Sequence, residues 1–378
     1  SGTRTPPCPS GLWKPWMGWT GADQERQKLM KIIVDAMGGD NAPLAPVEGA
    51  LRAAEDLGVE IILTGPEAVI RDCLTKLGKT DLPQGVEIAP ASEVITMEDN
   101  PARAFKDKPD SSMTVGLNLL KAKKGDAFVS AGSTGALLSA ATLLIKRIRG
   151  IRRAALAPVV PTANGKMVLI DCGATAEGTP EYLMQFAYMG SYYAQRFLGV
   201  ENPRVALLNI GAEESKGLEL QKQTYALLTE AKQAGRIHFV GNIEGREAIT
   251  QGVDVLVTDG YTGNIFLKTM EGAAALFSGA LKEMLLASTK NKVAALMLKN
   301  SIGDFKKRFD SSEVGGTALL GISQPVVKAH GSSNAYAFYN AIRQAKTVAE
   351  ADIVGDIAAN VEHMRWERPK PAEKQEEG

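Results

Sequence analysis

Short runs of β-branched and aliphatic residues alternate with longer helical patterns through most of this 378-residue chain, and this alternation limits the fold more than any other feature. Strands that are apolar almost throughout and are separated by helices favour a parallel sheet covered on both faces. The sequence therefore predicts a doubly wound, three-layer α/β/α fold. The expected strands are Lys31–Asp35, Val59–Leu63, Asp126–Ser130, Met167–Asp171, Arg204–Ile210, Arg236–Val240, Asp254–Thr258 and Pro325–Lys328, and the clearest helical patterns are Ala45–Leu57, Thr134–Arg147, Pro180–Leu198 and Leu218–Ala234.

The two ends of the chain differ in composition from the rest. Residues 1–29 hold three of the four tryptophans among several prolines and lack the apolar segment of a signal peptide. We interpret them as an appended leader, with the native start near Met30; a short tryptophan-bearing docking segment is the alternative. Residues 365–378 are highly charged and are expected to form a solvated tail. Residues 30–364 contain no linker-like stretch and are predicted to form the catalytic domain.

Overall composition excludes several classes of protein. The chain has 43 Lys+Arg and 43 Asp+Glu residues, a net charge of +0, which argues against a protein that coats nucleic acid. Cys8, Cys73 and Cys172 are far apart, so neither a disulfide framework nor a zinc cluster is expected. No apolar run approaches the roughly 18 residues that span a bilayer. These features predict a soluble protein of a reducing compartment.

Glycine-rich polar loops directly follow most of the predicted strands. The carboxyl ends of strands in an open parallel sheet share one edge, and ligands bind in the crevice at that edge. We therefore expect these loops to surround a single cleft. The loop residues that we assign to it are Asp35, Gly38, Gly39, Asp40, Asp171 and Asp259.

Two of these loops have the chemistry of anion-binding sites. Ser133 and Thr134 lie between a strand and a helix, and Ser332 and Ser333 repeat the arrangement near the end of the chain. Backbone N–H groups at a helix N-terminus, together with hydroxyl groups, bind anions. Simple helix capping is the alternative for either loop alone. The presence of both favours an anionic ligand such as phosphate.

Nucleotide and metal motifs are not matched. No GxGxxG follows a predicted strand, and residues 78–80 (GKT) lack the first glycine of a P-loop. Asp35 with Asp40, or Asp254 with Asp259, could hold Mg²⁺, although such acids more often cap helices. We expect no cofactor and no metal.

The segment from Gly272 to Phe309 is helical in pattern throughout and divides at residues 288–292. Apolar residues lie on both sides of this division, with lysines nearby. Such a hairpin is suited to contact with a second subunit or a membrane surface, and a core-packed hairpin is the third possibility. The residues assigned to its tip are Leu285, Leu286, Val293, Leu296 and Met297.

Several of these segments resemble those of one known family. The matching segments are DAMGGDNAP (35–43), SAGSTGA (130–136), DCGA (171–174), DGYTGN (259–264), GGTALLG (315–321) and HGSSNA (330–335). From about Met30 to Met364 the chain resembles the bacterial phosphate acyltransferases of phospholipid synthesis, the PlsX family. One departure is visible, because Thr175, Ala176 and Glu177 follow DCGA where the family usually has Asn and a nearby Asp.

The resemblance implies transfer of a fatty acyl group from acyl-acyl carrier protein to inorganic phosphate. The product, an acyl phosphate, would supply a membrane glycerol-3-phosphate acyltransferase. The resemblance also implies a homodimer with an isocitrate/isopropylmalate dehydrogenase-like fold. Such a protein would be located in the cytoplasm and attached peripherally to the inner face of the plasma membrane.

The chemistry of such a transfer suggests roles for particular residues. A phosphate dianion is a competent nucleophile and a thiol with a pKa near 8.5 is a tolerable leaving group, so no covalent enzyme intermediate is needed. The four loop hydroxyls would bind phosphate. Lys216 would offset its charge, and Asn264 or a loop N–H would stabilise the thioester oxyanion. His330 would either protonate the departing thiolate or hold its own loop.

Three rival functions share parts of this pattern. They are a phosphate acetyltransferase-like enzyme that uses coenzyme A thioesters, a decarboxylating dehydrogenase that needs Mg²⁺ and a nicotinamide, and a non-catalytic scaffold that tethers carrier protein to the membrane enzyme. Because carrier protein is typically acidic, the densest basic stretch is our candidate docking surface, with a solvated helix end as the alternative. That stretch contains Arg147, Arg149, Arg152 and Arg153.

Overall fold

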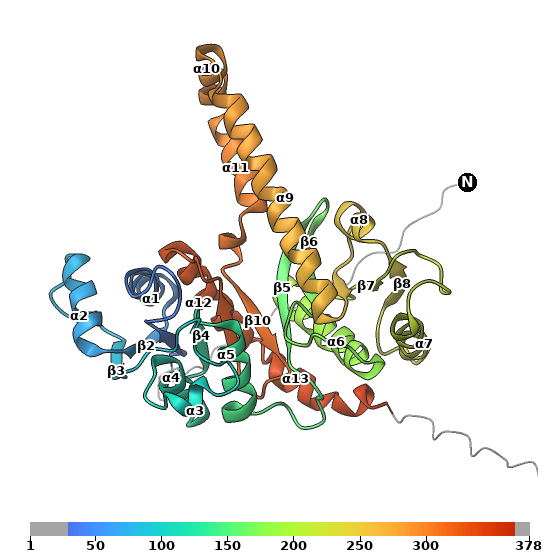
Figure 1. The fold of residues 1–378 in the computed structure, drawn as a ribbon, viewed down its shortest axis with the longest axis horizontal. Helices are drawn as coiled ribbons and strands as arrows, with labels where there is room; N and C mark the ends of the chain where they lie inside the picture. Colours follow the sequence, from blue (N-terminus) through green and yellow to red (C-terminus); the bar gives the residue numbers. More distant parts are fainter. Residues whose placement is uncertain (1–28, 367–378) are drawn as a thin grey trace, which may run out of the picture.

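Within residues 29–366, the part of the chain that the computed structural model describes, a continuous mixed sheet carries helices on both faces (Figure 1). The sheet has 11 strands in the order β3-β2-β1-β4-β11-β10-β5-β6-β9-β7-β8. The strands are β1 (Lys31–Asp35), β2 (Glu60–Gly65), β3 (Val86–Pro90), β4 (Ala127–Ser130), β5 (Ala155–Thr162), β6 (Gly165–Ile170), β7 (Val205–Leu208), β8 (Phe239–Ile243), β9 (Val255–Val257), β10 (Gly316–Leu320) and β11 (Val326–Ala329).

Strand direction reverses across the middle of this sheet. β1, β2, β3, β4 and β11 are parallel to one another, and β6, β7, β8 and β9 form a second parallel set. Between the sets, β11 with β10, β10 with β5 and β5 with β6 are all antiparallel pairs, so the second set runs opposite to the first. The carboxyl ends of the two sets therefore lie at opposite edges. The expectation that all the glycine-rich loops share one edge is wrong.

All eight expected strands are present, and three were missed. β5 contains Pro158 and Pro161, which argue against a strand, but its pairing with β10 and β6 holds it in the centre of the sheet. β10 is a short run between glycines, and β3 is a five-residue strand at the edge. The predicted α/β/α layering is confirmed.

Helices cover both faces of the sheet. They are α1 (Leu44–Leu57), α2 (Glu67–Lys76), α3 (Ala104–Asp107), α4 (Ser112–Lys121), α5 (Thr134–Ala140), α6 (Pro180–Tyr193), α7 (Glu219–Gln233), α8 (Gly245–Glu247), α9 (Gly260–Leu286), α10 (Thr289–Met297), α11 (Lys299–Phe309), α12 (Ala335–Glu350) and α13 (Ile353–Ala359). α5 and α6 each continue into a π-helical turn, Ala141–Ile145 and Ala194–Leu198.

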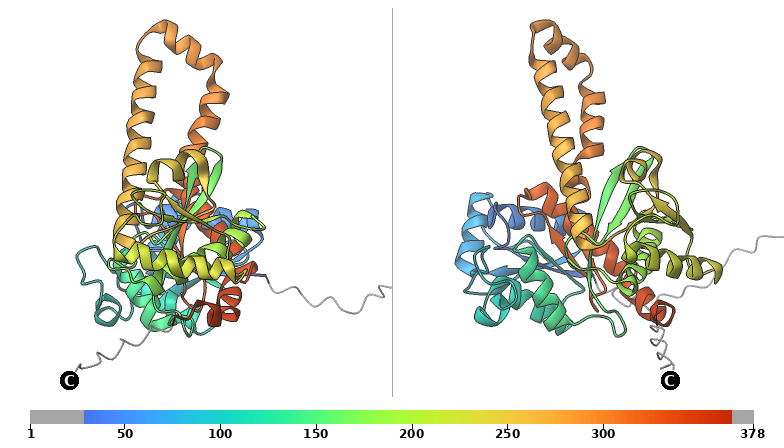
Figure 2. Two further views of the ribbon diagram at one scale, coloured as in Figure 1. Left: turned by 90° about the vertical axis from the view of Figure 1, so that its right-hand side faces the viewer. Right: turned by 45° about the vertical axis from the view of Figure 1, so that its right-hand side comes forward.

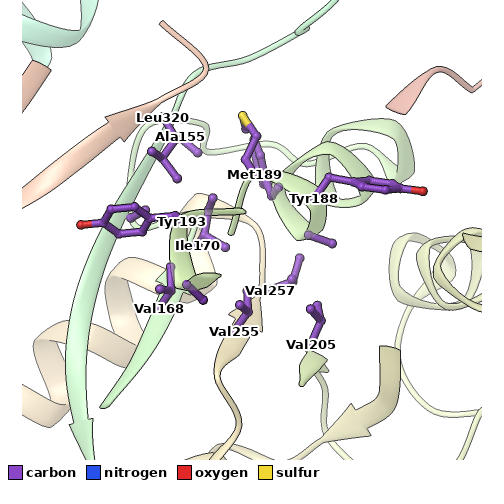
Figure 3. Packing of buried hydrophobic residues seen from close by; sticks show 14 of the residues in the cluster. Ala155, Val168, Ile170, Tyr188, Met189, Tyr193, Val205, Val255, Val257 and Leu320 are labelled. Carbon is purple, nitrogen blue, oxygen red and sulfur yellow. The ribbon is translucent and has the colours of Figure 1, made fainter. Parts of the chain in front are cut away.

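Alternate residues of each strand enter different hydrophobic clusters. Val168 and Ile170 of β6 belong to one cluster with Tyr188 and Tyr193 of α6 (Figure 3). The neighbouring side chains on the other face, Met167 and Leu169, join a cluster that also includes side chains of α4, α5 and the base of α9. This second cluster continues into the first half of the sheet and joins the two halves into one body. Trp366, at the start of the expected tail, packs against the cluster beneath α6; the rest of that tail and residues 1–28 of the expected leader lie outside the described residues.

α9, α10 and α11 form an arm that projects from the sheet (Figures 1 and 2). The division expected at residues 288–292 is confirmed, because α9 ends at Leu286 and Ser288 caps α10 by accepting a hydrogen bond from the Asn291 N–H at 3.1 Å. Leu286, Val293, Leu296 and Met297 are 52%, 56%, 73% and 82% exposed, and Leu285 is half-buried. The core-packed alternative is therefore wrong. In the described part of the chain, no helix combines the length and the hydrophobicity needed to cross a bilayer.

The base of α9 depends on glycine. A Cβ at Gly263 would lie 1.9 Å from the Asp171 carbonyl oxygen, whereas a Cβ at Gly272, further along the same helix, would meet open space. We expect Gly263→Ala to lower the free energy of unfolding by about 3 kcal/mol or more through overpacking. Gly272→Ala should raise it by up to about 1 kcal/mol through helix propensity. Denaturant unfolding of both variants measures the contrast; similar effects of the two substitutions would contradict this packing.

Candidate anion-binding site

Three loops meet at the carboxyl edge of the first strand set, and we call residues 36–43, 131–133 and 330–334 the loop cluster. The Asp40 N–H donates to the Gly331 carbonyl at 2.8 Å. The Asn41 Nδ2 group donates to the carbonyls of Ser332 and Ser333 at 3.0 and 3.2 Å. The loops that follow β1 and β11 are thus joined by direct hydrogen bonds.

Close approach of these loops requires glycine at two positions. A Cβ at Gly38 would lie 2.7 Å from both Asp35 Oδ2 and the Gly132 nitrogen. Gly39 has a φ of +102°, and a Cβ there would lie 2.9 Å from the Gly331 carbonyl oxygen. Only glycine satisfies both the steric and the conformational limits. The two glycines therefore allow the loops to pack backbone against backbone.

Asp35 fixes the base of the loop cluster. Its carboxylate is buried and accepts hydrogen bonds from Ser130 Oγ at 2.7 Å and from the Met37 N–H at 3.1 Å. Ser130 Oγ in turn accepts from the Gly132 N–H at 3.0 Å. Burial raises the pKa of Asp35, while hydrogen bonds from Ser112 and Ser130 oppose that rise. Asp35 therefore positions the β4 loop, and its oxygens are directed into the protein.

The hydroxyl groups assigned to phosphate differ in their surroundings. Ser133 is buried and caps α5 weakly, accepting from the Ala136 N–H at 3.5 Å, whereas Thr134 is exposed. Ser332 is exposed, and its Oγ lies 2.8 Å from His330 Nδ1. Ser333 Oγ is buried and has no hydrogen-bond partner among the described residues. An orphaned buried hydroxyl is costly unless a ligand satisfies it.

His330 is exposed at the entrance to the loop cluster. The Ser332 N–H donates to its Nδ1 at 3.3 Å, so this nitrogen is the acceptor and the proton of the neutral ring is assigned to Nε2.

Four other assigned residues, Asp171, Lys216, Asp259 and Asn264, follow strands of the second parallel set. Asp171 lies beside Leu156, whose N–H donates to its Oδ1 at 2.8 Å. Asp259 caps α9 at the same far edge, and Asn264 lies against Gly173. The loop that carries the exposed Lys216 is held over β8, because Asn242 Nδ2 donates to the Glu213 carbonyl at 2.9 Å.

Asp171 organises this second edge. Its buried carboxylate accepts N–H groups from Leu156, Cys172, Ala174 and Thr175 at 2.7–3.2 Å. Burial raises the pKa of Asp171 from 3.8 to about 6, and the four N–H donors limit the rise. Thr175, which stands where the family usually has Asn, is buried, and its backbone N–H donates to the Asp171 carboxylate at 2.7 Å.

A buried lysine near the loop cluster was missed by sequence reasoning. Lys328 of β11 is only 9% exposed, and its Nζ donates to the carbonyls of Ala131, at 3.3 Å, and Ala329. Burial lowers the pKa of Lys328 to about 8. The available signal is a charged residue at the end of an otherwise apolar strand.

The arginines of the basic stretch are exposed, and some of them are engaged with neighbouring groups. Arg152 Nε pairs with Glu181 at 2.9 Å, and Arg147 Nη1 donates to the Arg152 carbonyl at 2.6 Å. Arg153 lies 5.7 Å from the centre of the Tyr182 ring.

Two cavities lie elsewhere. One, of about 290 Å³, is lined by residues that include Tyr192 and Arg196; the other, of about 510 Å³, lies at the amino ends of β1 and β2 and includes Lys31 and Lys123. Neither is lined by the loop cluster.

Similar proteins agree with this architecture. A phosphotransacetylase from Streptococcus pyogenes matches with a TM-score of 0.56 and 20% identity over 86% of this chain and 94% of that one. The EutD phosphotransacetylase from Staphylococcus aureus matches with a TM-score of 0.53 and 18% identity over the same shares. The fold and the loop cluster thus define a protein of the phosphotransacetylase fold with a candidate anion site.

Relatives with higher sequence identity show the family to which the chain belongs. Residues 30–355 match the family described as "Fatty acid synthesis protein", and the chain belongs to this family. Proteins named phosphate acyltransferase are similar over nearly their whole length. The one from Clostridium acetobutylicum is 47% identical over 89% of this chain and 100% of its own, and that from Thermoanaerobacterium thermosaccharolyticum is 45% identical over 88% and 97%. The family resemblance seen in the motifs is confirmed.

The raised pKa of Asp171 has a measurable consequence. The folded state holds this proton more tightly than the unfolded chain does, so its stabilising contribution is full below pH 3.8 and is lost as the pH rises through about 6. We expect the free energy of unfolding of the wild type, minus that of Asp171→Asn, to fall by about 2 kcal/mol between pH 4 and pH 7. Denaturant unfolding at several pH values measures this difference; a value independent of pH would contradict the assignment.

Proposed function

We propose that the chain transfers a fatty acyl group from acyl-acyl carrier protein to inorganic phosphate, which produces an acyl phosphate for phospholipid synthesis. The relatives named phosphate acyltransferase support the reaction class. The observation that carries the proposal is the loop cluster, where Ser333 Oγ is buried without a partner among the described residues, close to the N-terminus of α12. Such a site suits an oxyanion ligand.

The reaction needs positioning more than activation. A phosphate oxygen attacks the thioester carbonyl carbon, the carbon–sulfur bond breaks, and the departing thiolate takes a proton. Ser133, Thr134, Ser332 and Ser333 are our phosphate ligands. The exposed His330, in its imidazolium form, is our donor of the proton: Nδ1–H would donate to Ser332 Oγ, 2.8 Å away, while the Nε2 proton passes to the thiolate and leaves a neutral ring. General acid catalysis of this kind is worth about 10²- to 10⁴-fold in rate.

The arm is our candidate for subunit and membrane contact. Its tip exposes Leu286, Val293, Leu296 and Met297 well away from the sheet. Apolar side chains bordered by lysines suit the boundary between lipid headgroups and acyl chains. A homodimer that presents two tips to one membrane would bring the acyl phosphate to the membrane glycerol-3-phosphate acyltransferase that uses it, at the cytoplasmic face of the plasma membrane.

The decisive assay is release of free carrier-protein thiol by the purified full chain, with and without phosphate. We expect release that depends on phosphate and a lower rate with the matching coenzyme A thioester. His330→Ala should lower kcat by about 100-fold or more while leaving the KM for phosphate nearly unchanged. Equal rates with both donors would favour the phosphate acetyltransferase-like alternative, and no release with either would favour the scaffold.

The same assay tests the basic stretch. Arg152→Glu with Arg153→Glu should raise the KM for the carrier-protein donor and leave the KM for the coenzyme A donor unchanged. The reason is that only the carrier protein has an acidic surface that these arginines would attract. An unchanged carrier-protein KM would remove this surface from docking.

The arm is tested by cosedimentation with vesicles that contain anionic lipid. Leu296→Glu with Met297→Glu should abolish most of the vesicle-bound fraction, because two charges would enter the apolar layer. Val240→Glu, an exposed apolar site on β8 away from the arm, is the matched control and should leave binding unchanged. Full binding by the arm variant would refute membrane contact through the tip.

A further inference from the structure

A groove at the amino edge of the first strand set has no role in the functions described so far. It is the cavity of about 510 Å³ whose lining comes from β1, β2, β3 and the carboxyl end of α4, and we call it the amino-edge groove. Its volume is within the range of about 300–1,000 Å³ that is typical of binding sites. The loop cluster follows the opposite ends of β1 and β4, so an occupant of the groove would leave the loop cluster open.

The groove has an apolar floor. Its apolar lining residues are Ile62, Ile88, Ala89 and Leu119. At the rim, Lys31 Nζ pairs with Glu60 at 3.0 Å and with Glu87 at 3.1 Å. These three charges therefore satisfy one another, and the apolar floor is the surface that remains to be covered.

Two further lysines at the rim, Lys123 and Lys124, lack a charged partner. Both line the groove and are exposed, and neither forms an ion pair within 4.0 Å in the part of the chain that the structure describes. Their backbone is fixed by a Schellman motif at the end of α4, in which the Lys124 N–H donates to the Leu119 carbonyl at 3.0 Å and the Lys123 N–H to the Leu120 carbonyl at 2.8 Å. Lys123 has a φ of +57°, a conformation that glycine adopts at lower cost. A side chain kept in a strained backbone at the rim of a groove indicates a role in binding.

The chemistry of the groove suits a neutral aromatic occupant. Its lining contains three lysines and three acidic residues, so it attracts neither an anion nor a cation strongly. The face of an aromatic ring attracts an unpaired ammonium within about 6 Å, and tryptophan is the best such ring. Tryptophan also covers apolar surface and keeps one polar N–H, which can donate to a carboxylate at the rim.

The chain itself carries tryptophans whose tether begins at the groove. Trp13, Trp16 and Trp19 precede β1 in the sequence, and Lys31, the first residue of β1, lines the groove. The stretch from Trp19 to Met30 spans up to about 36 Å when fully extended, whereas β1 and β3 are about 10 Å apart. The spacing of the tryptophans matches the three residues per turn of polyproline II, in which their rings would share one side. A short flexible tether holds its occupant at an effective concentration in the millimolar range.

We infer that the tryptophan segment, residues 13–19, docks in the amino-edge groove. An indole ring packs on the floor against Leu119 and Ala89, with the ammonium groups of Lys123 and Lys124 over its face. Of the two interpretations of residues 1–29, the docking segment is therefore the one that we favour. The groove lies apart from the loop cluster, so this contact is independent of the proposed acyl transfer.

Tryptophan fluorescence of the full chain reports docking directly. Three of the four tryptophans lie in residues 1–29, and Trp366→Phe removes the fourth. In that background the emission should be blue-shifted and shielded from acrylamide. Leu119→Glu, which places a charge on the apolar floor, should shift the emission to the red and raise the quenching constant to that of the urea-unfolded chain. Quenching that is as strong before this substitution as after it would overturn the inference.

A pair of lysine substitutions tests the aromatic contact without altering the floor. Lys123→Met with Lys124→Met should lower the docking equilibrium constant, measured from the shielded fraction, by about 2- to 5-fold for each ammonium lost. Lys121→Met with Lys166→Met, two exposed lysines outside the groove, is the matched control and should leave the fluorescence unchanged. Tryptophans that stay fully shielded in both the floor and the groove-lysine variants would show docking elsewhere and overturn the inference. If Leu119→Glu fails to fold, the groove-lysine pair decides it.

Hydrogen exchange gives a second readout, on the side of the groove. Trp13→Ala, Trp16→Ala and Trp19→Ala together should speed amide exchange in residues 86–90 and 122–126, which docking would cover. Unchanged exchange in these residues would contradict docking at the amino-edge groove. Shielding of the tryptophans that appears only as the protein concentration rises would show docking into a second copy, and it would overturn the intramolecular contact.

Discussion

One reversal of strand direction determines where chemistry can occur in this protein. Because β10 pairs antiparallel with both β11 and β5, and β5 pairs antiparallel with β6, the two parallel strand sets present their carboxyl ends at opposite edges. The loops after β1, β4 and β11 are thereby gathered at one edge, and those after β6, β7 and β9 at the other. A shared cluster of buried apolar side chains joins the halves, so this separation is fixed by the core.

α9 connects the second edge to the arm. It begins at Asp259 beside the buried Asp171, where Gly260 and Gly263 permit close contact, and it then runs past the sheet into the arm. The same helix thus reaches from the second edge to the exposed tip. In the proposed function, the tip is where the protein contacts the membrane that receives the product.

Much of the fold was predictable because the strands of the two parallel sets are short, apolar and bounded by glycine. The hairpin and its division were predictable for a similar reason, since Ser288 is a strong helix cap. The relative direction of the two strand sets could not be predicted from the sequence. β5 carries two prolines, β10 is short, and without these two strands the chain looks like one parallel sheet. The hydroxyl loops at Ser133 and Ser332 depended only on local pattern and fell within one cluster, whereas the position of Lys216 relative to them depends on strand direction. Lys328 was missed because its environment is created by loops distant in sequence.

The zero net charge of the chain conceals strong local electrostatics, of which the buried Lys328 ammonium is the clearest case. The most direct test of the account is a crystal structure of the full chain with orthophosphate bound. The account predicts a phosphate ion in the loop cluster, within hydrogen-bond distance of Ser333 Oγ. Phosphate bound elsewhere, with the loop cluster unchanged, would contradict it.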